Sequence, residues 1–436
     1  MSTEQFTGRA VPGPPTAVSP TATGPHSTSD PGGTTGGAPP SGGAGGAAGA
    51  VKSPVLASRL PTLTGLRAPV ALAVFLFHAS LLFPSIRLLA DDSTAEGFYR
   101  AVAQVGGLTM PFWFALSGFI LVWSHRGNPS PTTWWRRRYV KIVPPYIVGW
   151  ILARVLVEGA DGSHTTLTQD FLSFFMLQSW VPDVPTNFSV NNVGWSLSTE
   201  AFFYLAFPAM YPVLRRIPAA RLKYWIGGVV LAICAVPLLT YAVIPVGTAV
   251  VPNEPAHSAN YFWFAYIFPP ARLLDFVLGM LVARAVMLGR WRNLGLAGSG
   301  ALLAVSYVVA LNVPMLWGIR VACLLPAVMV IAAGAMADSQ GTSSLFRNRF
   351  LVWFGDISFA FYLVHFTILE YTRELLGDRL FSTPATIGLL AAQFAVSTLL
   401  AWALYACVER PVTRRWSRSR RARAGSASAT PTPARM

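Results

Sequence analysis

Two ionisable residues, Arg67 and His78, lie within the first long apolar stretch of the chain, residues 63–83. Ionisable side chains at membrane depth are costly and are usually functional. Their spacing is about three helical turns, which puts both side chains on one helix face about 16 Å apart. A cation near one interface and an imidazole near the middle of the bilayer suit a ligand with an anionic head and a reactive group further in. The alternative is a snorkelling arginine and a histidine that only packs.

A basic cluster follows a pair of tryptophans later in the chain. It consists of Arg136, Arg137, Arg138 and Lys141. Tryptophans mark a membrane interface, and cations beside them usually anchor the topology. Arginine forks and lysine point charges also bind phosphates. The cluster therefore predicts either a topology anchor or a phosphate site on the same side of the membrane as Arg67.

Trp195, Ser198 and Glu200 open another apolar span. A serine here can cap the helix, and the helix dipole stabilises a carboxylate in or just after the first turn. Glu200 is then either a well-placed helix acid or a group that orients a histidine or polarises an acceptor hydroxyl. We expect Trp195 and Ser198, beside it, to contact substrate.

Weaker candidates lie further along the chain. A single intramembrane histidine such as His365 is often a packing residue, and we also consider it a substrate contact. Arg272 and Asp275 are three residues apart, so we expect them to pair on one helix face. The three cysteines show no metal-ligand spacing, and we expect no metal site.

The composition identifies the class of protein that must position these residues. Hydrophobic residues make up 53% of the chain and charged residues 12%, with a mean hydropathy of +0.48. This is typical of a polytopic membrane protein. The net charge of +15 does not indicate a nucleic-acid partner, because the cations gather in loops and in the C-terminal tail.

The hydropathy pattern predicts an all-α polytopic membrane protein with about ten transmembrane helices. Each span has roughly the 17–25 residues that a crossing helix needs. The predicted spans are 63–84, 102–124, 142–160, 195–214, 224–245, 265–283, 294–312, 319–337, 350–371 and 384–407. Residues 165–192 fit no span and are predicted to form an interfacial or re-entrant piece over the mouth of a cavity.

Charge and composition also predict the orientation and the domains. Lys and Arg gather in alternate loops and in the C-terminal tail, which places the N- and C-termini in the cytoplasm. Residues 1–58 are rich in Gly, Pro, Ser and Thr and predict a disordered tail. Residues 59–415 form the predicted transmembrane domain, and 416–436 a basic disordered tail. We expect a multi-pass protein of the cell (plasma) membrane, in contact with the lipid bilayer.

Several of these segments together resemble the acyltransferase 3 family of integral membrane acyltransferases. The matching stretches are 63–67 with 77–79, 111–119, 136–146, 195–200, 272–279, 355–359 with 362–366, and 409–411. The likeness covers about residues 60–415. Each motif is weak alone, and their order and spacing carry the resemblance.

The resemblance implies transfer of an acyl group from acyl-CoA, with acetyl-CoA the expected donor, to a hydroxyl of a carbohydrate, glycolipid or secondary metabolite. The family's arginine and histidine fall on Arg67 and His78, and its acid falls on Glu200. Two departures are visible, since the family usually has arginine at Lys141 and commonly an acid at Thr64.

This reading gives a mechanism for the chain. A buried histidine stays neutral, so His78 can take the proton of an acceptor hydroxyl, and Glu200 is expected to fix its tautomer. An acyl-histidine intermediate is an open alternative. A transporter or flippase is the competing class, because polar residues in a bundle with proline-broken spans suit it as well.

Overall fold

The computed structural model describes residues 59–125, 130–157, 165–248 and 258–416. These residues form helices joined by loops, and the β-structure among them is an isolated bridge between Leu89 and Phe381. They belong to one unit of the chain, Ser53–Met436. The predicted N-terminal tail and residues 417–436 lie outside the described residues.

Long helices overlap all ten predicted spans. They are α1 (Pro61–Ala79), α3 (Val105–Ser124), α4 (Pro131–Leu156), α8 (Gly194–Arg216), α9 (Leu222–Val243), α11 (Pro269–Met287), α12 (Gly295–Ala310), α14 (Leu324–Gln340), α15 (Arg349–Leu376) and α16 (Thr383–Leu404). Among the described residues, eight helical segments are long and apolar enough to cross a membrane. The two predicted spans that fall short are α8, with 23 residues but more polar side chains, and α12, with 16 residues. The all-α multi-pass membrane fold is confirmed.

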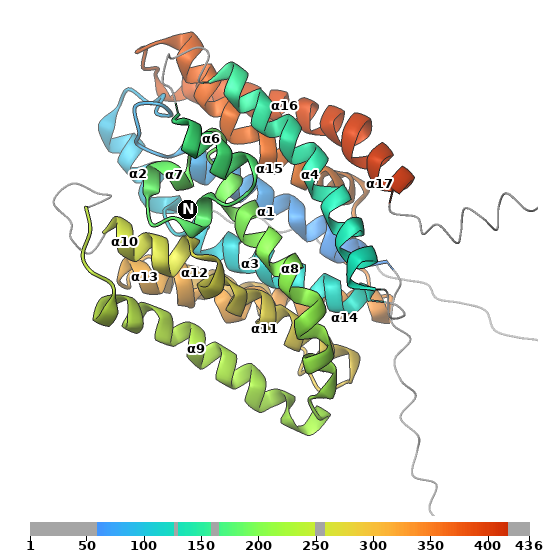
Figure 1. Ribbon diagram of the computed structural model, residues 1–436. Coiled ribbons are helices and arrows are strands. Elements are labelled where there is room, and N and C mark those ends of the chain that lie inside the picture. Colours follow the sequence, from blue (N-terminus) through green and yellow to red (C-terminus); the bar gives the residue numbers. More distant parts are fainter. Residues whose placement is uncertain (1–58, 126–129, 158–164, 249–257, 417–436) are drawn as a thin grey trace, which may run out of the picture. The chain divides into compact units, whose positions relative to one another are not determined.

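Short helices connect the long ones. They are α2 (Asp92–Val102), α6 (Leu167–Phe174), η1 (Gln178–Trp180), α7 (Val184–Asn187), η2 (Ala219–Arg221), α10 (Ala259–Phe262), η4 (Trp263–Ile267), α13 (Met315–Trp317), η5 (Gly318–Ala322), η6 (Leu345–Arg347), η7 (Tyr405–Glu409) and α17 (Arg410–Trp416). Figure 1 shows α1 and α3 in the interior, with α9 and α16 at the edges. In the most apolar 18-residue stretch of each segment, 78% of the residues are buried for the segment with α3, and 22% for each of the segments with α9 and α16. The functional side chains described below come mainly from α1, α3, α4, α8 and α15.

The segment that fits no span, 165–192, folds into the short helices α6, η1 and α7. A capping box between Thr166 and Gln169 starts α6. The Tyr146 hydroxyl donates to the Ser173 carbonyl at 2.5 Å, which ties α6 to α4. The Asn187 amide donates to the Gln178 carbonyl at 2.7 Å, which closes the segment on itself. These contacts satisfy polar groups that a spanning helix would have satisfied along its own backbone.

Contacts between helix ends show that the long helices alternate in direction. At one end, which we call the Thr62 end, the Thr62 N–H and hydroxyl donate to the Asp338 carboxylate, joining the start of α1 to the end of α14. Arg284 near the end of α11 donates to the Ile217 carbonyl just after α8, at 2.7 Å. At the opposite end, the Pro84 end, Arg373 Nε of α15 donates to the Pro84 carbonyl at 2.8 Å. The starts of α1, α4 and α15 and the ends of α3 and α8 therefore lie at the Thr62 end.

Glycines let the interior helices touch through their backbones. A Cβ added to Gly355 of α15 would lie 1.9 Å from the Thr64 carbonyl oxygen of α1. A Cβ at Gly279 of α11 would lie 1.9 Å from the Ala115 oxygen of α3, and one at Gly118 would lie 2.1 Å from the Phe276 oxygen. Small residues of this kind are typical of membrane helix interfaces. They fix α1 against α15 and α3 against α11.

A buried ion triad reinforces the core. Asp275 Oδ2 accepts from Arg272 at 3.0 Å and from Arg320 at 2.6 Å, and all three side chains are fully buried. Arg272 Nε also donates to the Tyr266 carbonyl at 2.6 Å. The predicted pairing of Arg272 with Asp275 is confirmed, and Arg320 from η5 joins it. Such a network is strongly destabilised when one partner is removed.

Candidate active site

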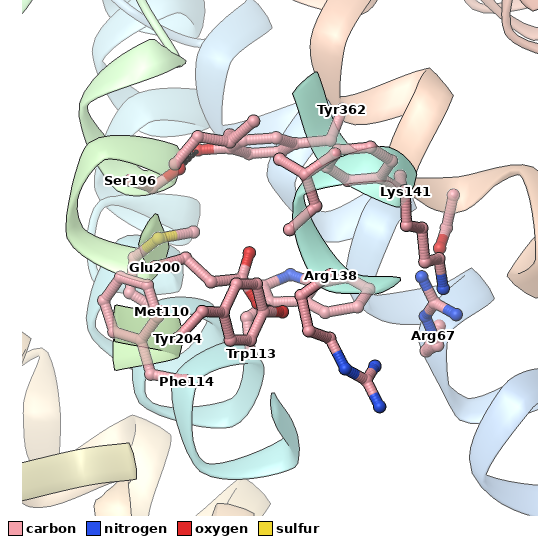
Figure 2. Close-up of a pocket in the computed structure, with 14 residues that line it drawn as sticks. Arg67, Met110, Trp113, Phe114, Arg138, Lys141, Ser196, Glu200, Tyr204 and Tyr362 are labelled. Carbon is pink, nitrogen blue, oxygen red and sulfur yellow. Dashed lines mark hydrogen bonds between the residues drawn. The ribbon is translucent and has the colours of Figure 1, made fainter. Parts of the chain in front are cut away.

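A cavity with apolar walls and several charged and hydroxyl groups opens between α1, α3, α4, α8 and α15, with a volume of about 130 Å³ (Figure 2). Since one water needs about 10–15 Å³ by this measure, the space holds roughly ten waters. Its walls carry the residues Arg67, Met110, Trp113, Phe114, Arg138, Lys141, Ile142, Ser196, Leu197, Glu200, Tyr204, Ser358, Phe359 and Tyr362. Side chains far apart in the sequence thus share one space, which fits a small substrate group rather than a whole coenzyme.

Three cations line this cavity. They are Arg67, Arg138 and Lys141, and Figure 2 shows the ends of Arg67 and Lys141 beside each other. Arg67 lies over the Trp113 ring, 5.4 Å from its centroid. Arg67 Nε and Trp113 Nε1 are both buried without a hydrogen-bond partner. Buried donors without partners cost free energy, so this wall suits an acceptor-rich, anionic ligand.

The predicted basic cluster divides between the cavity and the surface. Arg138 and Lys141 line the cavity, whereas Arg136 and Arg137 are exposed and do not line it. The helix period explains the division, because α4 begins at Pro131 and turns by about 100° at each residue. Two members of the cluster therefore belong to the site, and the structure brings the other two no nearer to it.

Carboxylates balance part of the positive charge. Asp356 of α15 and the buried Glu409 act on Arg67 and Lys141 through space. Glu409 lies in η7, where the wider π-helical turn ends α16 and begins α17. Single π-turns of this kind often occur at functional sites. The sequence analysis missed both acids as site residues, although the stretch at 409–411 matched the family.

Glu200 belongs to a hydrogen-bonded network in the cavity wall. Its Oε1 accepts from the Ser117 hydroxyl at 2.8 Å and from the Tyr204 hydroxyl at 2.5 Å. The two hydroxyls lie 3.1 Å apart. Glu200 lies six residues after the start of α8, past its first turn. Tyr204 is four residues further along, a spacing that places side chains side by side and could have identified it.

His78 pairs with His365. His78 Nδ1 lies 2.8 Å from His365 Nε2, and the two rings stack with centroids 5.1 Å apart. His365 Nδ1 lies 2.9 Å from the Tyr362 carbonyl and 3.2 Å from the Phe361 carbonyl. The expected pairing of His78 with Glu200 is wrong, because the ring hydrogen bond goes to His365 and Glu200 is held by two hydroxyls. The orienting partner comes from α15.

These contacts fix the tautomers of both rings. Carbonyl oxygens only accept, so His365 Nδ1 carries the hydrogen and its Nε2 is an acceptor when the ring is neutral. His78 Nδ1 must then donate to His365. The Nε2 atom of neutral His78 is left with a lone pair. That is the atom which a general base at this position would use.

The two predicted α1 residues differ in depth from the sequence prediction. His78 lies in the last turn of α1, one residue before its end, and Arg67 lies six residues after its start. Arg67 is therefore further inside the bundle, and His78 closer to a helix end, than we expected. The reason is that α1 starts at Pro61 and ends at Ala79, whereas the predicted span ran from 63 to 84.

Tyr362 connects the cavity to the histidine pair. Its side chain lines the cavity, and its hydroxyl lies 2.7 Å from the Ser196 hydroxyl. Its carbonyl holds His365, three residues further along α15. The sequence analysis missed Tyr362 and Ser196. The polar i, i+3 pair of Tyr362 and His365 was the available signal for the first.

Trp195 and Ser198 do not line the cavity. The Trp195 ring packs against the rings of Tyr266 and Phe114, with centroids 5.3 and 6.5 Å apart. Ser198 is 1% exposed, and its hydroxyl has no hydrogen-bond partner. Because Ser196 and Glu200 lie on the cavity face of α8, Ser198, two positions from each, falls on the far side, and the Trp195 ring is taken up by the packing against Tyr266 and Phe114. Their predicted contact with substrate does not follow from this geometry.

The donor set of the site is basic and hydroxylic. In the described part of the chain, no group of three or more His, Cys, Asp or Glu side chains is placed to hold a metal ion. The cavity and its surroundings offer cations, carboxylates, hydroxyl networks and a histidine pair with a defined free nitrogen.

Comparison with known proteins agrees with this arrangement. The sequence matches a family model described as an acyltransferase domain, over residues 60–406. It is 37% identical over 374 residues to the acyltransferase MdmB of Streptomyces mycarofaciens, an alignment that covers 83% of this chain and 94% of that protein. No solved structure matches significantly. The chain, a multi-pass bundle with a histidine pair beside a basic cavity, belongs to the acyltransferase 3 family of integral membrane acyltransferases.

Proposed function

We propose that this acyltransferase moves an acyl group, acetyl by expectation, from acyl-CoA to a hydroxyl of a carbohydrate, glycolipid or secondary metabolite. The enzyme assignment answers the transporter alternative, because the family is one of acyltransferases. The donor, the acyl group, the acceptor and the location in the cell membrane are our proposals.

The cavity supports an anionic, thioester-bearing donor. Three cations line it, and the buried Arg67 Nε and Trp113 Nε1 lack partners. Arginine and lysine groups in such a place bind phosphate and polarised carbonyl oxygens. We place the donor along α1, with its phosphates at the Thr62 end, which we propose to be cytoplasmic. Its acyl end then lies toward His78, about 16 Å from Arg67 along the helix.

The observation that carries the proposal is the relay from the Tyr362 carbonyl through His365 to His78. It leaves His78 Nε2 free to accept the proton of the acceptor hydroxyl while the hydroxyl oxygen attacks the thioester carbonyl. The C–S bond then breaks, and the sulfur leaves as a thiolate that takes the proton from His78 Nε2. The products are the ester and the free thiol. Transfer through an acyl-His78 intermediate is the alternative route.

The test is label transfer from radiolabelled acetyl-CoA to candidate acceptors by the purified protein. We expect wild-type protein to label a hydroxyl-bearing acceptor. Arg67→Ala should raise the donor KM about tenfold or more, since losing a charged hydrogen bond costs about 1.5–3 kcal/mol. Arg67→Lys should recover part of the loss. A donor KM unchanged in both variants would remove Arg67 from the donor site. If folded wild-type protein transfers no label from acetyl-CoA to any candidate acceptor, the proposal that acyl-CoA is the donor is contradicted.

A further inference from the structure

A second basic cluster lies beside the cavity at the Thr62 end. It consists of His125, Arg138, Tyr211, Arg215 and Arg284, and we call it the Tyr211 cluster. Its members come from the ends of α3, α8 and α11 and from the first turns of α4. The ring centroids of His125 and Tyr211 are 4.1 Å apart, and the Arg215 guanidinium carbon lies 5.9 Å from the Tyr211 centroid. Four helix ends thus bring three arginines and a histidine together at the Thr62 end.

The cations of this cluster repel one another. Arg215 and Arg138 both act on His125, and Arg215 also acts on Arg284. Among the ion pairs of the described residues, none joins a carboxylate to His125, Arg138, Arg215 or Arg284. His125 Nε2 and Arg284 Nε are buried and have no hydrogen-bond partner. Like charges held together with unsatisfied donors suit a polyanion.

The simpler explanation covers only part of this arrangement. Arginines at the ends of α8 and α11 favour the negative pole of the helix dipole and a cytoplasmic location. Neither effect requires that Arg138, from the start of α4, lies close enough to act on the same histidine. Neither satisfies the buried His125 Nε2. A bound polyanion would account for both observations.

The Tyr211 cluster is continuous with the cavity. Arg138 belongs to both, since it lines the cavity and acts on His125. Along α8, Arg215 is 19 residues from Ser196 at the far wall of the cavity. This is about 28 Å at 1.5 Å per residue. A ligand that uses both sites must be long, with phosphates at one end and an uncharged arm.

We infer that the Tyr211 cluster binds the phosphate-bearing nucleotide end of the donor while the pantetheine arm enters the cavity past Arg138. This rests on the proposed function, in which the donor is an acyl-CoA. It assigns donor phosphate binding to His125, Arg138 and Arg215 rather than to Arg136 and Arg137, which lie outside the cluster. The same chemistry would also hold the headgroup phosphate of an anionic lipid, so the test separates the two sources.

The experiment compares acetyl-CoA with acetyl-pantetheine, which carries the same thioester and no phosphate. We expect Arg215→Gln to raise KM about tenfold or more for acetyl-CoA. The KM for acetyl-pantetheine should not change. Arg215→Lys should recover part of it. Arg216→Gln is the matched control, because Arg216 is the adjacent arginine, is exposed like Arg215, and lies outside the cluster; it should change neither KM. An equal effect on both donors, or on neither, would overturn the inference.

Calorimetry with coenzyme A alone separates this inference from the proposed function. If Arg215→Gln weakens coenzyme A binding although the wild-type protein transfers no acyl group, the cluster stands and the acyl-transfer proposal fails. If Arg215→Gln instead loses co-purifying phosphatidylglycerol and keeps wild-type coenzyme A binding, the cluster is a lipid site and the inference is wrong.

Discussion

The central residue contact is the hydrogen bond between His78 and His365, 287 positions apart in the sequence. A neutral His78 alone has two tautomers, and only one presents Nε2 as a base. The acceptor nitrogen of His365 selects that tautomer, and two backbone carbonyls select the tautomer of His365. In catalytic triads a carboxylate selects the tautomer of the catalytic histidine, at the cost of a buried charge. Here a neutral ring does it inside a bundle where a second charge would be expensive.

We predict that His365→Ala lowers kcat at least tenfold and leaves the donor KM within twofold. The reason is that His365 acts on His78 and does not touch the donor. His365→Gln should recover part of kcat, because its amide oxygen can accept from His78 Nδ1. Steady-state kinetics with both variants tests this. If both variants lose the same activity together with thermal stability, His365 is a packing residue.

The sequence identified both members of the histidine pair, but not that they pair, and it identified Glu200 without its partners. Arg67 and His78 were visible because both are ionisable groups in one apolar stretch at helical spacing. His365 was visible as a single histidine, but nothing in the sequence places α15 against α1. Glu200 was likewise found, whereas its partner Ser117 comes from another helix. Contacts between distant helices depend on three-dimensional packing, which periodicity does not encode.

At the scale of elements, the contact between α1 and α15 positions the whole site. The two helices approach where Gly355 meets the Thr64 carbonyl, and they carry Arg67, His78, Tyr362 and His365 between them. The helices themselves could be predicted from hydropathy. Their closest approach could not, because a glycine in a membrane helix is common and does not name its partner.

We predict that Gly355→Ala lowers both thermal stability and acyl transfer. Its Cβ would lie 1.9 Å from a backbone oxygen, so α1 and α15 must move apart, and overpacking of this kind costs about 1–3 kcal/mol. Gly388→Ala on α16 is the control, because a Cβ there meets nothing within 4 Å. Thermal unfolding in detergent and the label-transfer assay measure the two effects. A Gly355→Ala protein that matches the control in both assays would mean that the helices are not in contact there.

The Tyr211 cluster gives donor binding a pH dependence. Burial, and then the charges of Arg215 and Arg138, lower the pKa of His125, so its ring is neutral in the free protein near neutral pH. Bound phosphates would favour the protonated ring and raise that pKa. The groups that face His125 are Arg138 from α4 and Tyr211 and Arg215 from α8, with Arg284 of α11 acting on the last two.

We therefore predict that coenzyme A binding takes up protons at mildly acidic pH and weakens as the pH rises. Calorimetry in two buffers of different ionisation enthalpy measures the uptake. His125→Asn should remove most of it and leave binding that varies less with pH. Proton uptake equal in the variant and the wild-type protein would show that another group titrates.

At the scale of the whole molecule, alternating helix directions sort the site into two ends. The Thr62 end holds the Tyr211 cluster, and the histidine pair lies toward the Pro84 end. Arg272 and Arg320 belong to the buried triad with Asp275 and are not loop cations. They therefore do not count against the gathering of Lys and Arg in alternate loops, which supports our proposal that the Thr62 end is cytoplasmic.

We predict that Gly97→Cys reacts with a membrane-impermeant thiol reagent in intact cells, whereas Ser343→Cys reacts only after lysis. Both positions are exposed, with Gly97 on α2 toward the Pro84 end and Ser343 between α14 and α15 at the Thr62 end. The background must lack Cys234, Cys323 and Cys407. The reverse pattern would put the Tyr211 cluster outside the cell, where cytosolic acyl-CoA does not reach it.

The most direct test of the account is the turnover of His78→Ala. His78 is half-buried at the end of α1, so its removal should leave the protein folded, with thermal unfolding close to that of a Ser80→Ala control from the same turn. Loss of a general base lowers the rate by about 10²-fold or more. We therefore predict that transfer of labelled acetyl from acetyl-CoA falls about a hundredfold or further, with coenzyme A binding unchanged. Near-normal turnover by a folded His78→Ala protein would contradict the proposed mechanism.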